Sequence, residues 1–283
     1  MSALLNDITF GQYYPGNSVV HRMDPRAKVV LTVAAIVLIF LARVAVAVAC
    51  TVVFTAAAVA LTRMPVKLYL KTLKPIIPII ILTSVINALY VSSGTVVVHV
   101  WQITITTGGL LTALYMAVRI CLLIITSSLL TYTTSPTQLT DAIERLLSPL
   151  ALLRLDVHTL AMMMTIALRF IPTLIEETEK IMAAQKARGA DLDSGGLMRR
   201  VKALVPVLIP LLISSFRRAA ELADAMECRC YHGGKDRTRM RQLHLSARDW
   251  LAFAVTAAVF GAVVAANQMA SGLLYALFTG GAL

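Results

Sequence analysis

Two arginines occupy matching positions near the ends of two long amphipathic segments. Arg188 lies in the run Lys186-Ala187-Arg188-Gly189-Ala190, and Arg229 lies between Cys228 and Cys230. Gly189 is typical of the residue that ends a helix, and an arginine before it suits the negative end of the helix dipole. A guanidinium also offers N–H donors in a fixed fork to the acidic or carbonyl groups of a partner. The recurrence on two consecutive helices leaves a local helix-ending role and a binding role both open.

Other chemistry finds little support in the residue pattern. Cys228, Cys230 and His232 are closely spaced, but no fourth ligand is evident nearby, so no metal site is predicted. Gly233-Gly234-Lys235 lacks the spacing of a phosphate-binding loop, and neither HExxH nor GxSxG occurs. The apolar stretches contain no paired acids, His or activated nucleophile, which argues against an intramembrane enzyme. We therefore expect a non-catalytic chain that binds no cofactor itself.

The composition is that of an integral membrane protein. Of 283 residues, 58% are apolar and 14% are charged, and the mean hydropathy is +0.77. Soluble domains usually contain about 25% charged residues. The 26 Lys and Arg against 15 Asp and Glu give a net charge of +11, which could indicate nucleic-acid binding. In so apolar a chain, the charge fits the positive-inside bias of membrane proteins better.

The apolar stretches predict an all-α protein with about five membrane spans. A span needs about 20 apolar residues, and Arg43 is expected at a tight turn between the first two spans. The first span is short and is expected to use the snorkelling stems of Arg26 and Lys28. The predicted spans lie near 27–42, 44–62, 75–91, 108–132 and 250–278.

The predicted organisation has three parts. Residues 1–133 hold four spans, 134–249 form a charged segment without a span, and 250–283 hold the last span. Of the 26 Lys and Arg, 24 fall on one side of this arrangement, and the loop 92–107 has none. The positive-inside rule therefore predicts a multi-pass protein of the cell membrane with a cytoplasmic N-terminus and an external C-terminus.

Arg119 lies well inside the fourth predicted span, where an ionised side chain is costly and suggests a function. No acidic residue lies in any predicted span, so Asn87 or a backbone carbonyl is the expected partner. We favour a structural clamp between helices over a conducting pathway, because no chain of acids or His accompanies Arg119.

The charged segment predicts three helices, two of them long. The short helix runs from 136 to about 147, and the long ones run over 156–187 and 197–228, with apolar residues at helical spacing. These apolar stripes are wider than one helical hairpin needs, so they could hold a partner or could simply be internal core. The candidate partner contacts are Leu139, Ile143, Met163 and Leu208.

Several of these motifs together resemble those of the transmembrane T component of energy-coupling factor (ECF) transporters, the EcfT/CbiQ-like family. They are Tyr132-Thr133-Thr134-Ser135-Pro136, Ala167-Leu168-Arg169-Phe170-Ile171-Pro172, Gln185-Lys186-Ala187-Arg188-Gly189-Ala190 and Ser215-Phe216-Arg217-Arg218-Ala219, with Ser18, Asp24-Pro25-Arg26 and Lys28. The resemblance covers nearly the whole chain. It implies an energy-coupling subunit of an ABC importer, which links ATP hydrolysis by two ATPase subunits to a membrane-embedded, substrate-binding S component for a vitamin or metal ion. ATP and Mg²⁺ would then be bound by the ATPases.

The resemblance also implies roles for the two arginine-bearing helix ends. Ala187, Arg188 and Gly189 match a motif of the coupling helices that docks into an ATPase subunit. Cys228, Arg229 and Cys230 keep the arginine but replace both small neighbours, so Gly233-Gly234 is the expected helix stop there. The alternative function is a stand-alone permease, which would show inverted repeats or broken helices with intramembrane charges. Arg119 is the only such charge in the predicted spans.

The charge asymmetry generates a test of topology. In a variant without native cysteines, Ser93→Cys should react with a membrane-impermeant thiol reagent added to intact cells, and Ser194→Cys should react only after permeabilisation. Labelling of Ser194→Cys from outside would contradict the predicted orientation.

Overall fold

The computed structural model describes residues 13–91, 95–100, 103–149, 156–190, 196–233 and 244–279. The chain divides into two compact units. The first, here the bundle unit, comprises Tyr13–Ser135 and Leu243–Leu283, and the second, the long-helix unit, is Pro136–Gln242.

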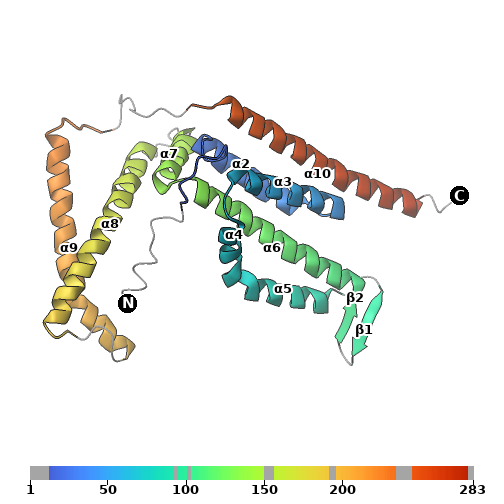
Figure 1. Ribbon diagram of the computed structural model, residues 1–283, viewed down its shortest axis with the longest axis horizontal. Coiled ribbons are helices and arrows are strands. Elements are labelled where there is room, and N and C mark those ends of the chain that lie inside the picture. Colours follow the sequence, from blue (N-terminus) through green and yellow to red (C-terminus); the bar gives the residue numbers. More distant parts are fainter. Residues whose placement is uncertain are drawn as a thin grey trace. The chain divides into compact units, whose positions relative to one another are not determined.

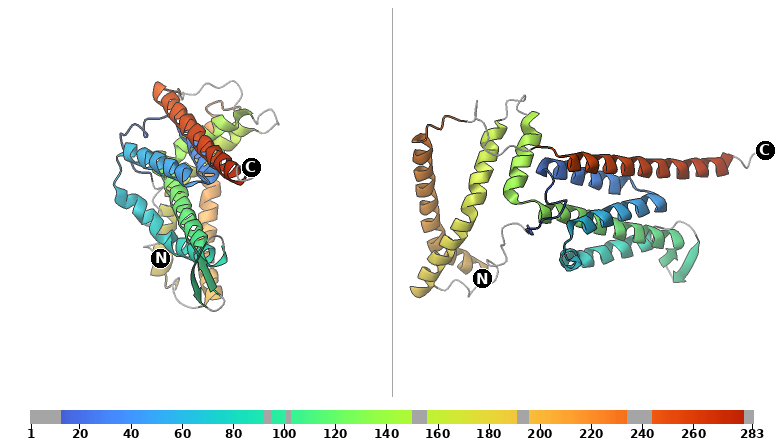
Figure 2. Two further views of the ribbon diagram at one scale, coloured as in Figure 1. Left: turned by 90° about the vertical axis from the view of Figure 1, so that its right-hand side faces the viewer. Right: turned by 45° about the horizontal axis from the view of Figure 1, so that its top comes forward.

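The bundle unit is helical except for one short hairpin (Figure 1). Helices α2, α3, α6 and α10 pack side by side, and α5 packs along α6 (Figures 1 and 2). The described elements, in chain order, are α2 (Pro25–Leu41), α3 (Ala45–Thr62), α4 (Val66–Leu73), a 3-10 turn (Lys74–Ile76), α5 (Ile77–Tyr90), β1 (Val96–Val100), β2 (Ile103–Thr106), α6 (Thr107–Thr133) and α10 (Ala247–Thr279).

The hairpin lies in the segment that sequence analysis left as an external loop. Strands β1 and β2 pair antiparallel, with Val100 opposite Ile103 and a register shift between Val96 and Val98. The runs that pair are rich in β-branched residues, which suit extended backbone.

Six helical stretches among the described residues are long and apolar enough to cross a membrane. Four of them overlap with predicted spans: Ala45–Thr62, Val66–Tyr90, Thr107–Thr133 and Ala247–Met269. Val66–Tyr90 begins well before the predicted start at 75, because it also includes α4 and the 3-10 turn. The other two, Val157–Ala187 and Val201–Glu227, belong to the segment predicted to lie in the cytoplasm, so length and composition alone do not separate spans from coupling helices. The predicted first span is α2, which has only 17 residues, or about 25 Å at 1.5 Å per residue.

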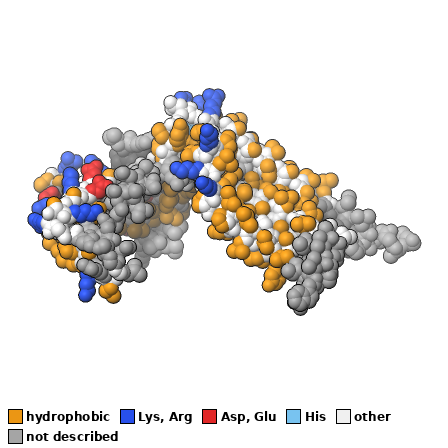
Figure 3. All heavy atoms as spheres, turned by 60° about the horizontal axis from the view of Figure 1, so that its bottom comes forward, with side chains coloured by type: hydrophobic (Ala, Val, Ile, Leu, Met, Phe, Trp, Pro, Cys, Tyr) orange, Lys and Arg blue, Asp and Glu red, His pale blue; other side chains and the backbone are white. Residues whose placement is uncertain are grey.

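The buried core of the bundle unit is small. Leu38, Ala42, Ala47 and Val263 form one cluster between α2, α3 and α10, and Met64, Tyr69 and Tyr132 form another. Few large apolar side chains of the described spans are fully buried. On the face drawn in Figure 3, hydrophobic side chains cover most of the described spans, as expected for helices that face lipid.

The long-helix unit contains α7 (Pro136–Leu147), α8 (Val157–Ala187) and α9 (Leu197–Glu227). Helix α8 packs against both α7 and α9. The Asp156 carboxylate caps α8 by accepting hydrogen bonds from the backbone N–H and the hydroxyl of Thr159, at 3.1 and 2.6 Å. Each of the three helices begins and ends within one residue of its predicted bounds.

Close packing of α5 on α6 depends on Gly109. A Cβ atom at this position would lie 2.7 Å from the Val91 carbonyl oxygen and 2.9 Å from that of Ala88. Both oxygens belong to the end of α5, so a side chain here would push the two helices apart.

We expect Gly109→Ala to destabilise the bundle by about 1–3 kcal/mol, the usual cost of overpacking a close contact. Gly261→Ala in α10 is a matched control, because a Cβ there meets nothing within 4 Å; it should leave stability unchanged or raise it by up to about 1 kcal/mol. Thermal unfolding in detergent measures both, and equal midpoints for the two variants would refute the packing argument.

Candidate functional site

Helix α8 ends in a Schellman motif that presents Arg188. Gly189 has a positive φ of 85°, its N–H donates to the Lys186 carbonyl at 3.0 Å, and the Ala190 N–H donates to the Gln185 carbonyl at 3.0 Å. These are the paired 5→2 and 6→1 bonds of the motif. Arg188 is therefore the residue on which the helix terminates, immediately before the left-handed residue.

Helix α9 ends in the same motif, built from different residues. Cys230 takes the left-handed position with φ 56°, its N–H donates to the Glu227 carbonyl at 2.8 Å, and the Tyr231 N–H donates to the Met226 carbonyl at 3.0 Å. Arg229 thus occupies the position that Arg188 has on α8. The predicted stop at Gly233 is wrong, because Cys230 already ends the helix; Gly234 lies outside the described residues.

Both helix ends are open to solvent. Ala187, Arg188 and Gly189 are exposed, and so are Cys228, Arg229 and Cys230. Within the described residues, neither guanidinium forms a hydrogen bond or ion pair. The side chains are therefore available to a partner, and the fixed backbone behind each limits where its guanidinium can reach.

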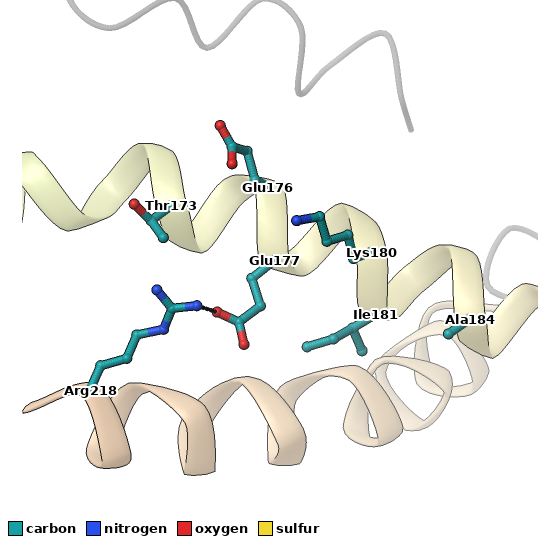
Figure 4. Close-up of a pocket in the computed structure, with 7 residues that line it drawn as sticks. All are labelled: Thr173, Glu176, Glu177, Lys180, Ile181, Ala184 and Arg218. Atoms are coloured by element: carbon teal, nitrogen blue, oxygen red, sulfur yellow. Dashed lines mark hydrogen bonds and ion pairs between the residues drawn. The ribbon is translucent and has the colours of Figure 1, made fainter. Parts of the chain in front are cut away.

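The two ends lie at opposite ends of the α8–α9 pair. Glu177 on α8 accepts hydrogen bonds from Ser214 and Arg218 on α9, and Figure 4 shows its carboxylate reaching the Arg218 guanidinium. Eight residues further along α8, Gln185 donates to the Pro206 carbonyl of α9 at 3.4 Å. Residues further along α8 thus contact residues earlier in α9. The two helices are therefore antiparallel, and their C-terminal ends point in opposite directions.

The residues that join these two helices were not among the predicted site residues. Glu177 forms a salt bridge with Arg218, and both side chains line a hollow of about 400 Å³. The Gln185 contact also has a specific cause. Pro210 has no N–H, so the Pro206 carbonyl lacks its usual donor four residues on. A glutamine on the neighbouring helix supplies one.

The predicted partner contacts differ in exposure. Leu139 and Ile143 are half-buried, whereas Met163 is 50% exposed and Leu208 is 63% exposed. On α9, Val207 is 5% exposed and Ser214 is also buried, so these two residues mark the buried face of the helix. The predicted stripe of α9 instead lies on the open side, so at these positions it is not internal core of the described unit; its exposed members are Leu204, Leu208, Leu212 and Phe216.

Arg119 in α6 binds a backbone carbonyl. Its Nη2 atom donates to the Ala42 carbonyl at 2.7 Å, at the end of α2. Asn87, the other expected partner, instead donates to the Thr83 carbonyl of its own helix at 2.8 Å. Asn267 of α10 donates to the Leu41 carbonyl at 2.7 Å and accepts from the Arg43 N–H at 3.3 Å. Arg119 therefore acts as a clamp on the α2–α3 turn, which removes the main motive for a conducting pathway.

The part of the chain that matches known proteins includes both arginine-bearing helix ends. Residues 16–240 match the family model described as CbiQ, cobalt transport protein. The chain is 52% identical over 253 residues to the energy-coupling factor transporter transmembrane protein EcfT of Ruminiclostridium cellulolyticum, which covers 89% of this chain and 94% of that protein. It is 45% identical over 246 residues to the protein of the same name from Bacillus subtilis, covering 87% and 93% of the two chains.

The two Schellman ends generate a paired test of backbone strain. Gly189→Ala forces a Cβ into a left-handed conformation and should weaken the α8 end by about 1 kcal/mol, whereas Cys230→Gly should strengthen the α9 end by a similar amount. Hydrogen exchange of the amides at 188–190 and 229–231 measures each effect locally. Exchange that changes in the same direction in both variants would contradict the assignment of Cys230 to the glycine position.

Proposed function

Because the chain belongs to the CbiQ family and is the transmembrane energy-coupling component of an ECF-type transporter, we propose that it links ATP hydrolysis in two partner ATPase subunits to a membrane-embedded, substrate-binding S component. The observation that carries this proposal is the repeated helix end. Two helices of 31 residues each are followed by the same hydrogen-bonded motif, and in each an exposed arginine directly precedes the left-handed residue.

The geometry suits two separate docking points. An α-helix of 31 residues is about 46 Å long, and the antiparallel pairing puts Arg188 and Arg229 at opposite ends of the pair. One ATPase subunit would receive each end, with the guanidinium inserted among acidic or carbonyl groups. Movement of the two subunits towards each other would then act on both helices at once. ATP hydrolysis would belong to these partners and not to this chain.

We place α8 and α9 outside the membrane despite their apolar character. Each has a charged second half: α8 carries Glu176, Glu177, Glu179 and Lys180, and α9 carries Arg217, Arg218, Glu221, Asp224 and Glu227. Charges of this number are costly inside a bilayer. This placement keeps the predicted five spans, the cytoplasmic N-terminus and the external C-terminus.

The exposed apolar side chains of α8 and α9 are the proposed contact for the S component. Met163 and Leu208 are half or more exposed on helices that also carry the docking arginines. A partner held there would receive the movement of those helices directly. Leu139 and Ile143, which are half-buried, would contribute at the edge of this contact. Vitamins and metal ions are the substrate classes we expect such a partner to bind.

We expect the double variant Arg188→Glu with Arg229→Glu to abolish ATP-dependent uptake while the protein still inserts and folds. A buried guanidinium contact at an interface is typically worth about 2 kcal/mol or more, and charge reversal adds repulsion. The measurements are co-purification of the ATPases and vesicle uptake, with radiolabelled Co²⁺ and a panel of radiolabelled vitamins as probes. Single alanine variants should weaken coupling but keep one docking point.

The matched control is Lys180→Glu with Lys202→Glu, an equal charge change at exposed positions on the same two helices. It should retain both ATPases. If the arginines only complement helix dipoles, each contributes about 0.3–1 kcal/mol, and the arginine variant would behave like the control. Met163→Asp with Leu208→Asp, in the same co-purification, should release the S component and keep the ATPases.

A further inference from the structure

Lys28 near the start of α2 is a buried cation with structural partners from distant parts of the chain. Only 4% of its surface is exposed, so it does not snorkel to solvent as the sequence suggested. Its Nζ atom donates to the Thr133 carbonyl at 2.8 Å and to the His21 carbonyl at 3.1 Å. Thr133 is the last residue of α6, so the ammonium group caps the negative end of that helix.

Two buried carboxylates complement this cation and join two further helix ends. Asp249, with no exposed surface, accepts from the Ser246 N–H at 2.7 Å, which caps the start of α10. Its other oxygen accepts from the Asp24 N–H at 3.1 Å. Asp24 in turn caps α2 by accepting from the Arg26 N–H at 2.8 Å. Both carboxylates lie near enough to Lys28 to stabilise its charge electrostatically.

The group of Asp24, Lys28 and Asp249, here the anchor cluster, therefore fixes the end of α6 to the starts of α2 and α10. After Thr133 the chain passes through Thr134 and Ser135 and enters α7, so the anchor cluster lies at the covalent junction with the long-helix unit. Neighbouring contacts hold the same turn: the Tyr14 N–H donates to the Tyr132 carbonyl at 3.0 Å, and the Tyr132 hydroxyl bonds that of Thr72.

Buried charges of this kind are costly unless each is paired. Asp24 is also paired with the Arg26 guanidinium at 3.3 Å, whereas loss of Lys28 would remove the buried cation near Asp249. Apolar side chains could have packed the same helices without that cost. Unlike apolar packing, the charged side chains join three helix ends through directional hydrogen bonds. These bonds make the junction stiff.

We propose that Lys28 is a positioning residue for energy coupling: it ties the α6–α7 junction to α2 and α10, so that a displacement starting in the coupling helices is passed to these spans. This inference rests on the proposed function. Without the Lys28 bonds, the end of α6 would lose its direct tie to the start of α2, and less of the displacement would reach α2 and α10.

The test uses the full complex with both ATPases and the S component in lipid nanodiscs, and needs no transported substrate. Hydrogen exchange is compared with and without ATP plus vanadate, in peptides from α8 and α9 and in peptides covering 20–30 and 244–252. In the wild type, nucleotide should change exchange in both sets. In Lys28→Met, the change should persist in α8 and α9 and disappear at the starts of α2 and α10. Lys67→Met, which removes an exposed charge from α4, should behave like the wild type.

Persistence of the nucleotide response at α2 and α10 in Lys28→Met would overturn the proposal. If that variant does not assemble, Lys28→Gln, which keeps N–H donors without the charge, replaces it. Failure of both to assemble would assign Lys28 to folding alone and also reject the positioning role. A wild-type chain that binds no ATPase, or whose α8 and α9 ignore nucleotide, would instead refute the proposed function. Faster exchange at 130–135 in nucleotide-free Lys28→Met would still establish the anchor in that case.

Discussion

Several backbone groups at the ends of the spanning helices are buried inside the bundle, and its packing depends on how their hydrogen bonds are satisfied. Ala42, after α2, and Thr133, at the end of α6, are each 1% exposed. At three of these ends the bonding side chain comes from a helix distant in sequence. Arg119 and Asn267 hold the carbonyls at the end of α2, Lys28 holds the end of α6, and Asp249 accepts from the starts of α2 and α10. The hydrophobic clusters are small, so these directional bonds specify which helices are neighbours and in what register.

The two arginine-bearing ends show that one geometry can arise from different residues. On α8 the left-handed position is filled by glycine, which adopts it without steric cost, and on α9 by cysteine, which is strained there by about 1 kcal/mol. The backbone hydrogen bonds of the motif fix the position of each arginine backbone. The identity of the residues that flank the arginine does not. A motif comparison alone therefore underestimates how alike the two ends are.

Sequence periodicity predicted what depends on local information. The bounds of α7, α8 and α9 follow from caps and apolar spacing, and four predicted spans follow from hydropathy. The burial of Lys28, the carbonyl partner of Arg119 and the Glu177–Arg218 salt bridge depend on residues 41 to 105 positions away, which no local pattern reveals. The same apolar spacing also makes α8 and α9 resemble spans, because a helix that covers a partner and one that faces lipid both need apolar surface.

The prolines of α9 have a mechanical consequence. Pro206 and Pro210 each remove one rung of the intrahelical ladder, so α9 consists of two stiff segments joined at a compliant joint, and its ribbon bends in the first half (Figure 1). The amide of Gln185 bridges that joint from the neighbouring helix. The stiffness of α9 at this joint therefore depends partly on α8. The α8 residue that contributes to it, Gln185, lies three positions before Arg188.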